Sequence, residues 1–305
     1  MELNRQRALE ALEAGKAGLF SLAERLAANA ELGFFEYETL GILVKELAGT
    51  GARISTGYAR TGVMAELGRG AEGDPSIVLL ADMDALPTLG AQGGVCHSCG
   101  HHAQMAVMLG AFRALAEAGA AGLEGMRVIF AASPAEEYVD LGRRRALKEE
   151  GQIVYLSGKQ EMIRAGIMPE ASLVLKYHSM ADSPERQATV NGTLNGFMSK
   201  RAEFTGRASH AGAQPHKGVN ALSAAVLALQ AIDAQRSTFR DEDHIRVHPI
   251  LEEGGTTINS VPARAVLETY VRGADHEAVA QAAAKVDRAL RAGALAMGAS
   301  LTIRD

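Results

Sequence analysis

The sequence contains no tryptophan and only two cysteines, Cys96 and Cys99, among its 305 residues. Two cysteines three positions apart cannot cross-link a chain of this length, so nothing requires an oxidising compartment. No apolar run approaches the roughly 20 residues that span a bilayer, and the charged N-terminal segment lacks the apolar core of a signal peptide. A net charge of −5 offers no positive excess for nucleic acid or an anionic membrane. These absences predict a cytoplasmic protein without nucleic-acid or membrane partners.

Apolar residues make up 47% of the chain and charged residues 22%, an ordinary globular balance for one large or two smaller domains. Short continuous apolar runs are typical of strands buried on both faces of a sheet. Such runs occur at 76–81, 126–132 and 171–177. Residues 100–119, rich in Ala, Met and Leu and ending at glycine, predict a crossover helix between the first two runs. The fold class is therefore α/β, with a largely parallel sheet flanked by helices.

The pattern changes near residue 192. Alternating strands and long helices then follow in the order β-α-β-β-α-β, which is the ferredoxin-like unit. The predicted segments are 196–206, 218–237, 244–251, 265–273, 276–298 and 300–304. We therefore predict two domains, 1–191 and 192–305, the second a ferredoxin-like α+β domain. The charged stretch 138–168 is predicted to be a surface excursion with one or two helices.

Ionisable residues follow each of the three buried runs. They are Asp82 and Asp84 after the first, Glu136 and Glu137 after the second, and His178 after the third. Because ligands bind at the carboxyl ends of parallel strands, these side chains are expected to meet at one edge of the sheet. Cys99 and His101 stand at the start of the crossover helix, beside that same edge.

The stretch "CHSCGHH", residues 96–102, admits several interpretations. A c-type haem is excluded because Gly100, not histidine, follows Cys99. A structural zinc knuckle lacks a second ligand pair. A redox dithiol of Cys96 and Cys99, or an inert buried cysteine, stays open but explains none of the acidic residues. A metal centre explains the whole set, since thiolate, imidazole and carboxylate suit zinc and related ions, and a cysteine at a helix N-terminus is expected to have a lowered pKa.

Several motifs, in order, carry a family resemblance: "LLADMDALP", "CHSCGHHAQMA", "SPAEE", "GRASHAGAQPHKGVNAL" and "GGTTINSVPARAVLETYVRG". They resemble the amidohydrolase branch of the aminoacylase and carboxypeptidase metallopeptidases, which includes hippurate and indole-acetyl-amino-acid hydrolases. The resemblance implies a metal-dependent hydrolase that cleaves the amide bond of N-acyl amino acids or dipeptide-like substrates with a metal-activated water. It implies two divalent metal ions, zinc first, with manganese, cobalt or nickel as alternatives. It also implies a homodimer formed through the ferredoxin-like lid domain.

The resemblance also implies roles for individual residues. The implied metal ligands are Cys99, His101, Glu137 and His178. The implied catalytic residues are Glu136 as base, Asp84 as the carboxylate that orients the site, and His210 as the group that polarises the substrate carbonyl. His210 and Asn259 are the implied substrate-binding residues, and Asp82 stands where other branches keep a metal-binding histidine.

Two departures from the family pattern shape the expectations. The usual "CGHDxHTA" is "CGHHAQMA" here, so that His102 and Gln104 replace an aspartate and a histidine, and substrate preference is expected to differ. Family members also return from the lid to the catalytic domain, whereas this sequence stops at Asp305. The alternative expectation is therefore a catalytically impaired or non-catalytic fragment that binds metal and dimerises but lacks the last metal ligand.

Overall fold

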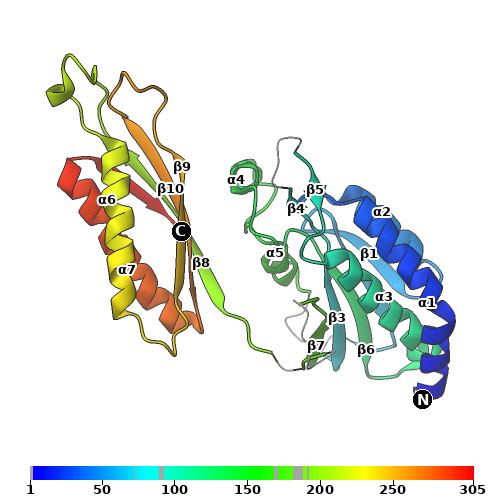
Figure 1. Cartoon of the computed structure of the whole chain (residues 1–305). Helices are drawn as coiled ribbons and strands as arrows, with labels where there is room; N and C mark the ends of the chain where they lie inside the picture. Colours follow the sequence, from blue (N-terminus) through cyan, green and yellow to red (C-terminus); the bar gives the residue numbers. More distant parts are fainter. Residues whose placement is uncertain (1–2, 72, 89–92, 168–170, 181–187, 191) are drawn as a thin grey trace. The chain divides into compact units, whose positions relative to one another are not determined.

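The computed structural model describes residues 3–71, 73–88, 93–167, 171–180, 188–190 and 192–305. The chain divides into two compact units, Met1–Ser183 and Pro184–Asp305 (Figure 1). The predicted domain boundary at residue 191 lies outside the described residues, so its position stays a prediction. Among the described helices, none combines the length and the apolar character needed to cross a membrane.

The first unit is built on a five-stranded sheet in the order β1-β2-β6-β3-β7. Its strands are β1 (Arg53–Tyr58), β2 (Gly62–Leu67), β3 (Ser76–Asp82), β6 (Arg127–Ser133) and β7 (Leu173–Lys176). Strands β6, β3 and β7 are parallel, and the hairpin β1–β2 adds two antiparallel strands at one edge. A small ribbon is formed by β4 (Leu86–Pro87) and β5 (Val95–Cys96). The α/β class and the three predicted parallel strands are confirmed.

Helices cover both faces of this sheet (Figure 1). They are α1 (Arg5–Ala28), α2 (Tyr37–Leu47), α3 (His101–Glu117), α4 (Leu141–Glu149) and α5 (Gly158–Arg164). The larger core lies under α1, α2 and α3, and a smaller one lies under α5. Met105, Leu109 and Phe112 recur at helical spacing along α3 and are all fully buried, so this one stripe fixes the crossover helix against the sheet.

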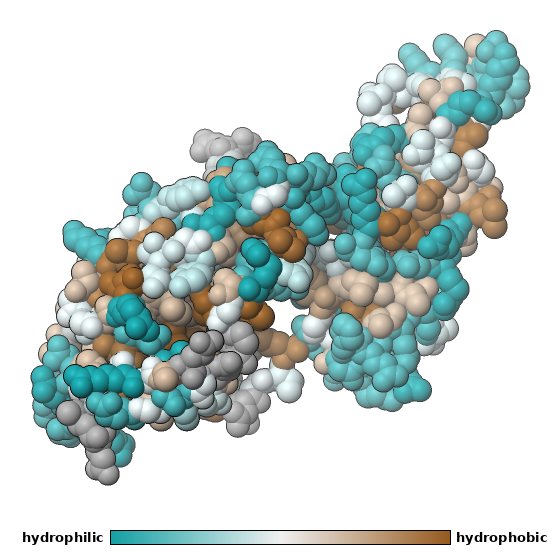
Figure 2. Space-filling model, turned by 180° about the vertical axis from the view of Figure 1, so that it is seen from behind, coloured by the Kyte–Doolittle hydropathy of each residue, from teal (hydrophilic) through white to brown (hydrophobic). Residues whose placement is uncertain are grey.

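Strand β7 differs from the prediction for its run. It is the edge strand of the described sheet, and Leu173, Val174 and Leu175 are 47%, 43% and 45% exposed. The interpretation that this run is buried on both faces is therefore wrong for the described part of the chain. A continuous apolar run reports hydrophobicity alone, and its place at the edge depends on which strands pair beside it. Figure 2 shows that apolar residues are also exposed among the hydrophilic residues of the molecular surface.

The second unit has a four-stranded antiparallel sheet in the order β11-β8-β10-β9. Helices α6 and α7 pack together over one face of it. The elements are β8 (Gly196–Thr205), α6 (Ala221–Ala234), β9 (Arg246–Glu253), β10 (Arg264–Gly273), α7 (His276–Met297) and β11 (Ser300–Arg304). This order is that of a ferredoxin-like fold, as predicted, and each predicted strand and helix is present within a few residues.

Candidate metal centre

His101 opens helix α3 and points into the carboxyl end of the sheet. The residue before it, Gly100, is the N-cap and has φ of 78°, a conformation that other residues rarely adopt. His101 is 1% exposed, and its Nδ1 lies 2.8 Å from the backbone oxygen of Asp84. In the neutral ring Nδ1 therefore donates to this carbonyl, which leaves Nε2 as the atom with a free lone pair.

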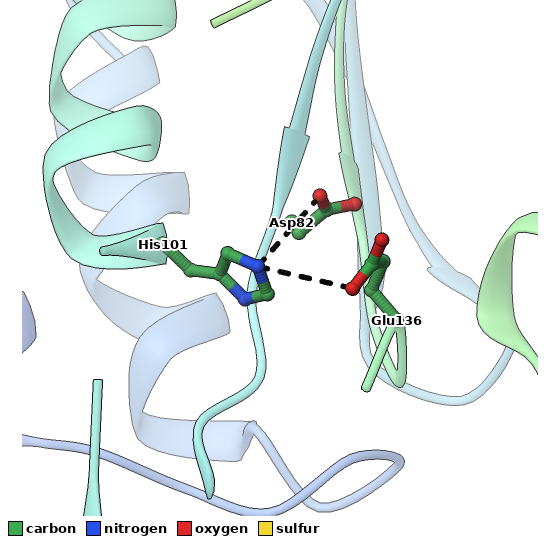
Figure 3. Close-up of side chains that lie close together, drawn as sticks. All are labelled: Asp82, His101 and Glu136. Carbon is green, nitrogen blue, oxygen red and sulfur yellow. Dashed lines mark ion pairs between the residues drawn. The ribbon is translucent and has the colours of Figure 1, made fainter. Parts of the chain in front are cut away.

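Three carboxylates surround that nitrogen. His101 Nε2 lies 3.9 Å from Asp82 Oδ2, 3.9 Å from Glu136 Oε2 and 3.9 Å from Glu137 Oε1. Figure 3 shows Asp82, at the end of β3, and Glu136, after β6, facing the ring. Within the described residues Nε2 has no hydrogen-bond partner. Ligand atoms of His101, Asp82 and Glu136 lie within 4.8 Å of one another, a spacing that suits a divalent cation wherever no other positive charge lies beside these carboxylates.

Cys99 and His178 are neighbours of this cluster but are not among the ligand atoms that lie within 4.8 Å of one another. The Cys99 thiol hydrogen-bonds to Glu137, and the rings of His178 and His101 are 5.9 Å apart and nearly perpendicular. Burial, this hydrogen bond and the negative charges of Glu137, Glu136 and Asp84 raise the pKa of Cys99 to about 12. The expectation of a lowered thiol pKa is thus wrong for the metal-free protein, because burial and the neighbouring carboxylates outweigh the helix N-terminus. A cation bound here would supply the charge that releases the thiol proton.

Asp84 connects two of the groups in the centre. Besides its carbonyl contact with His101, it accepts a hydrogen bond from the backbone N–H of Glu137 to Oδ2 at 2.9 Å. Arg144 Nη2 lies 3.6 Å from the same carboxylate oxygen. Asp84 thus fixes both an imidazole and the glutamate loop, as the orienting role would require.

The buried position of Arg144 shows that residues 138–168 are not only the surface excursion that the sequence predicted. This side chain of α4 is 1% exposed and donates to the backbone oxygens of Ala135, Glu137 and Leu156. The segment therefore forms a wall of the centre and not merely a surface excursion; its residue 168 lies outside the described part. Its charged composition resembled that of a solvated face, and nothing in the sequence marks one arginine as buried.

Glu36 is a further residue that the sequence did not point to. It is fully buried, and its carboxylate accepts hydrogen bonds from Thr61 Oγ1 at 2.5 Å and from the backbone N–H of Ala135 at 2.8 Å. Ala135 has φ of 50°, a strained value for a non-glycine residue, in the turn that presents Glu136. Burial, reinforced by the charge of Asp84, raises the pKa of Glu36 to about 7.

Two lysines reach the same carboxylates. Lys159, on α5, lies 2.7 Å from Asp82 Oδ1, and Lys176, at the end of β7, lies 2.5 Å from Asp82 Oδ2. Both also contact Glu136 Oε1, at 3.1 and 3.5 Å. Burial acts to raise the pKa of Asp82 and of Glu136, but the two ammonium groups outweigh it and lower both pKa values. Neither lysine was predicted, since one lies in the charged stretch and the other ends an apolar run.

The residues that depart from the family pattern have defined places. Gln104 Oε1 accepts the backbone N–H of Asp82 at 2.7 Å, and its Nε2 donates to the Tyr177 carbonyl at 2.6 Å. Gln104 therefore ties the ends of β3 and β7 together. The rings of His97 and His102 lie 5.5 Å apart, and burial lowers the pKa of His97 to about 4, so its ring stays neutral.

His210 and Asn259 belong to the second unit, where their segments are neighbours. Residues 210 and 260 form a β-bridge, and the Ala211 N–H donates to the Asn259 carbonyl at 2.9 Å. His210 Nδ1 accepts from the N–H groups of Gly212 and Ala213 at 3.2 and 3.0 Å. In the neutral ring the proton is therefore on Nε2, which makes this exposed histidine a hydrogen-bond donor.

Comparison with known proteins agrees with this arrangement. Residues 193–297 match the M20 peptidase dimerisation domain. The chain is 30% identical to a mouse Xaa-Arg dipeptidase, over 74% of this chain and 46% of that protein. It is 32% identical to a p-aminobenzoyl-glutamate hydrolase chain from Escherichia coli, over 70% of this chain and 48% of that one. The chain thus spans about half the length of these curated relatives.

Among solved structures, a dinuclear metal-binding M20 peptidase from Bacillus subtilis superposes with a TM-score of 0.64 at 23% identity, over 96% of this chain and 74% of that one. At this identity the likeness concerns the fold. Fold, centre and relatives together define the class of two-domain peptidases and amidohydrolases. Within that class, the chain is similar to the M20 peptidases, whose dimerisation domain matches residues 193–297.

Proposed function

We propose that this chain forms the catalytic centre of a metal-dependent hydrolase that cleaves the amide bond of N-acyl amino acids or dipeptide-like substrates. The observation that carries the proposal is the buried His101 Nε2, which has no hydrogen-bond partner among the described residues and lies 3.9 Å from each of three carboxylates. The names of the relatives, a dipeptidase and an aminobenzoyl-glutamate hydrolase, support the reaction class. A divalent ion held by Cys99, His101, Glu137 and His178 would act as a Lewis acid and lower the pKa of a bound water.

The protein groups have complementary roles in this proposal. Glu136 is kept ionised by its lysine neighbours, so it can accept the proton of the attacking water and return it to the leaving amine. Asp84 holds His101 and the Glu137 backbone in position. The Nε2–H of His210 would donate to the substrate carbonyl oxygen, where negative charge develops, and Asn259 would bind substrate beside it.

Further properties are proposed on narrower grounds. Zinc is the first candidate because thiolate, imidazole and carboxylate together suit it, with manganese, cobalt or nickel as alternatives. The resemblance implies two ions per chain, whereas Lys159 and Lys176 beside Asp82 favour one. The match to a dimerisation domain supports a homodimer through residues 192–305, and the cytoplasm stays the predicted location.

The test is hydrolysis of a panel of N-acetyl and N-benzoyl amino acids and Xaa-Arg dipeptides, with metal removed by a chelator and then restored. Activity should disappear on chelation, return with metal, and fall by about 10²-fold or more in Glu136→Ala. Glu149→Ala, on the exposed end of α4, is the matched control and should retain activity. Hydrolysis that survives both chelation and Glu136→Ala would defeat the proposal. Tight metal binding without turnover would favour the non-catalytic alternative.

A further inference from the structure

The two lysines beside Asp82 have a bearing on how many metal ions the centre can hold. The Asp82 side chain is fully buried, and each of its two oxygens has an ammonium group within ion-pairing distance: Lys159 at 2.7 Å and Lys176 at 2.5 Å. The lysine side chains are themselves only 25% and 24% exposed. Both ammonium groups also contact Glu136 Oε1. An ammonium group therefore lies next to each carboxylate oxygen of Asp82, and both ammonium groups lie next to Oε1 of Glu136.

We propose that Lys159 and Lys176 are built-in counter-ions that take the place of a second metal ion, so that the centre holds one divalent ion, on the side of Cys99 and Glu137. The inference rests on the proposed function, because it concerns the same centre. It separates this chain from the Bacillus subtilis relative, which is described as dinuclear.

The two sides of the centre differ in what a metal ion would have to displace. On the side of Glu137, the carboxylate contacts the Cys99 thiol and His101 Nε2, and neither group is an ammonium ion that a metal ion would have to displace. On the side of Asp82, an ion at the usual distance of about 2.0–2.2 Å from a carboxylate oxygen would lie within about 5 Å of an ammonium nitrogen, given the 2.7 Å and 2.5 Å ion pairs. Like charges at that distance in a partly buried site repel strongly, so the second ion is excluded unless the lysines move.

The balance of charge leads to the same count. The centre contains four carboxylates, and their ion pairs bring at least three cationic side chains in the described part of the chain. The carboxylates are Asp82, Asp84, Glu136 and Glu137, and the cations are Lys159, Lys176 and Arg144. With the Cys99 thiolate added, one divalent ion brings the centre to neutrality or slightly above. A second would leave a surplus of at least two positive charges, which a buried site does not tolerate.

The experiment measures the number of ions and their coupling, independently of activity. The metal-free 305-residue chain is titrated with Mn²⁺ and with Zn²⁺ in an isothermal calorimeter, and the Mn²⁺ samples are followed by electron paramagnetic resonance. We expect one tight site per chain and the spectrum of an isolated Mn²⁺ ion. The double variant Lys159→Met/Lys176→Met keeps the side-chain volume but removes both charges. It should gain at least about 10²-fold in affinity for a second ion and show the spectrum of an exchange-coupled pair. Lys148→Met, on the exposed end of α4, should behave like the wild type.

The outcomes separate this inference from the proposed function. Two tight ions with a coupled spectrum in the wild-type protein would overturn the counter-ion role and leave the hydrolase proposal intact. A double variant that folds but still takes one ion would also overturn it. No binding of Mn²⁺ or Zn²⁺ by the wild type would defeat the metal centre itself. Should the double variant fail to fold, the wild-type stoichiometry still decides, and each single variant is titrated in its place.

Discussion

The backbone of Glu137 and the ring of His101 are held by one residue, Asp84. Its backbone oxygen lies 2.8 Å from His101 Nδ1, and its Oδ2 accepts the Glu137 N–H at 2.9 Å. The fully buried Asp84 carboxylate thus holds the Glu137 backbone, and its Oδ1 also lies 3.5 Å from His101 Nδ1. Groups in this position orient metal ligands and increase their basicity.

Asp84→Asn keeps the size of that side chain and removes its charge. We expect metal affinity to fall by about 10–100-fold, because the amide no longer supports His101 and the Glu137 loop as a carboxylate does. Equilibrium dialysis against Zn²⁺ with elemental analysis measures the change. Asp74→Asn, in the turn before β3, is the control. An unchanged dissociation constant in Asp84→Asn would show that the carboxylate does not position the ligands.

Glu36 is expected to make stability depend on pH. Its pKa is about 7 in the folded chain against an ordinary value of 4.5, so between these values the folded state binds the proton more tightly than the unfolded state. Stability therefore falls as pH rises through this window, by about 3 kcal/mol in all. Glu36→Gln, which keeps an acceptor for the Ala135 N–H, should remove that fall. Urea unfolding at pH 5 and pH 8 measures it, with the exposed Glu38→Gln as control; an identical pH dependence in wild type and Glu36→Gln would refute the assignment.

Gly100→Ala tests the start of helix α3. At φ of 78° a Cβ is strained, and it would collide with Ser179 Oγ, which donates to the Cys99 carbonyl at 3.3 Å. We expect a loss of about 1–2 kcal/mol in unfolding free energy, together with weaker metal binding because Cys99 and His101 flank the residue. Gly142→Ala, in α4 with open space around its Cα, should be neutral or slightly stabilising. Equal effects of the two substitutions would contradict the special role of Gly100.

His210→Ala separates a catalytic role from a structural one in the second unit. Because the side chain is exposed, the melting temperature should change little. If Nε2–H donates to the developing oxyanion, kcat should fall by about 10²-fold or more while metal content stays constant. The nearby exposed His216→Ala is the control. Full activity of His210→Ala would remove this residue from the mechanism.

The sequence predicted elements whose signal is local. Residues 276–298 have helical spacing, a capping Asp275 whose side chain accepts the Ala278 N–H, and a glycine at the end; helix α7 follows these limits closely. The hairpin β1–β2 was not predicted, since its strands are short and have mixed polarity. The exposure of β7 was also missed, because a strand's place in the sheet depends on pairing between distant segments.

The residues of the metal centre also fall into two groups, those that the sequence predicted and those that it did not. Asp82, Glu136 and His101 could be expected together because each follows a strand or opens the crossover helix, and topology then brings them to one edge. Lys159, Arg144 and Glu36 could not, because their importance arises from burial and contact in the folded chain. Nor could the raised pKa of Cys99 be foreseen, since it depends on how many carboxylates surround the thiol.

The pairing of β8 with β11 joins the first and last strands of the second unit, with Thr205 opposite Ser300. During synthesis, strand β8 therefore leaves the ribosome nearly a hundred residues before β11, the second of the two strands that pair with it. Until then its free edge is open to pairing with another nascent chain. Ribosome-bound chains halted before residue 300 should accordingly depend more on chaperones than chains halted after residue 305 has emerged.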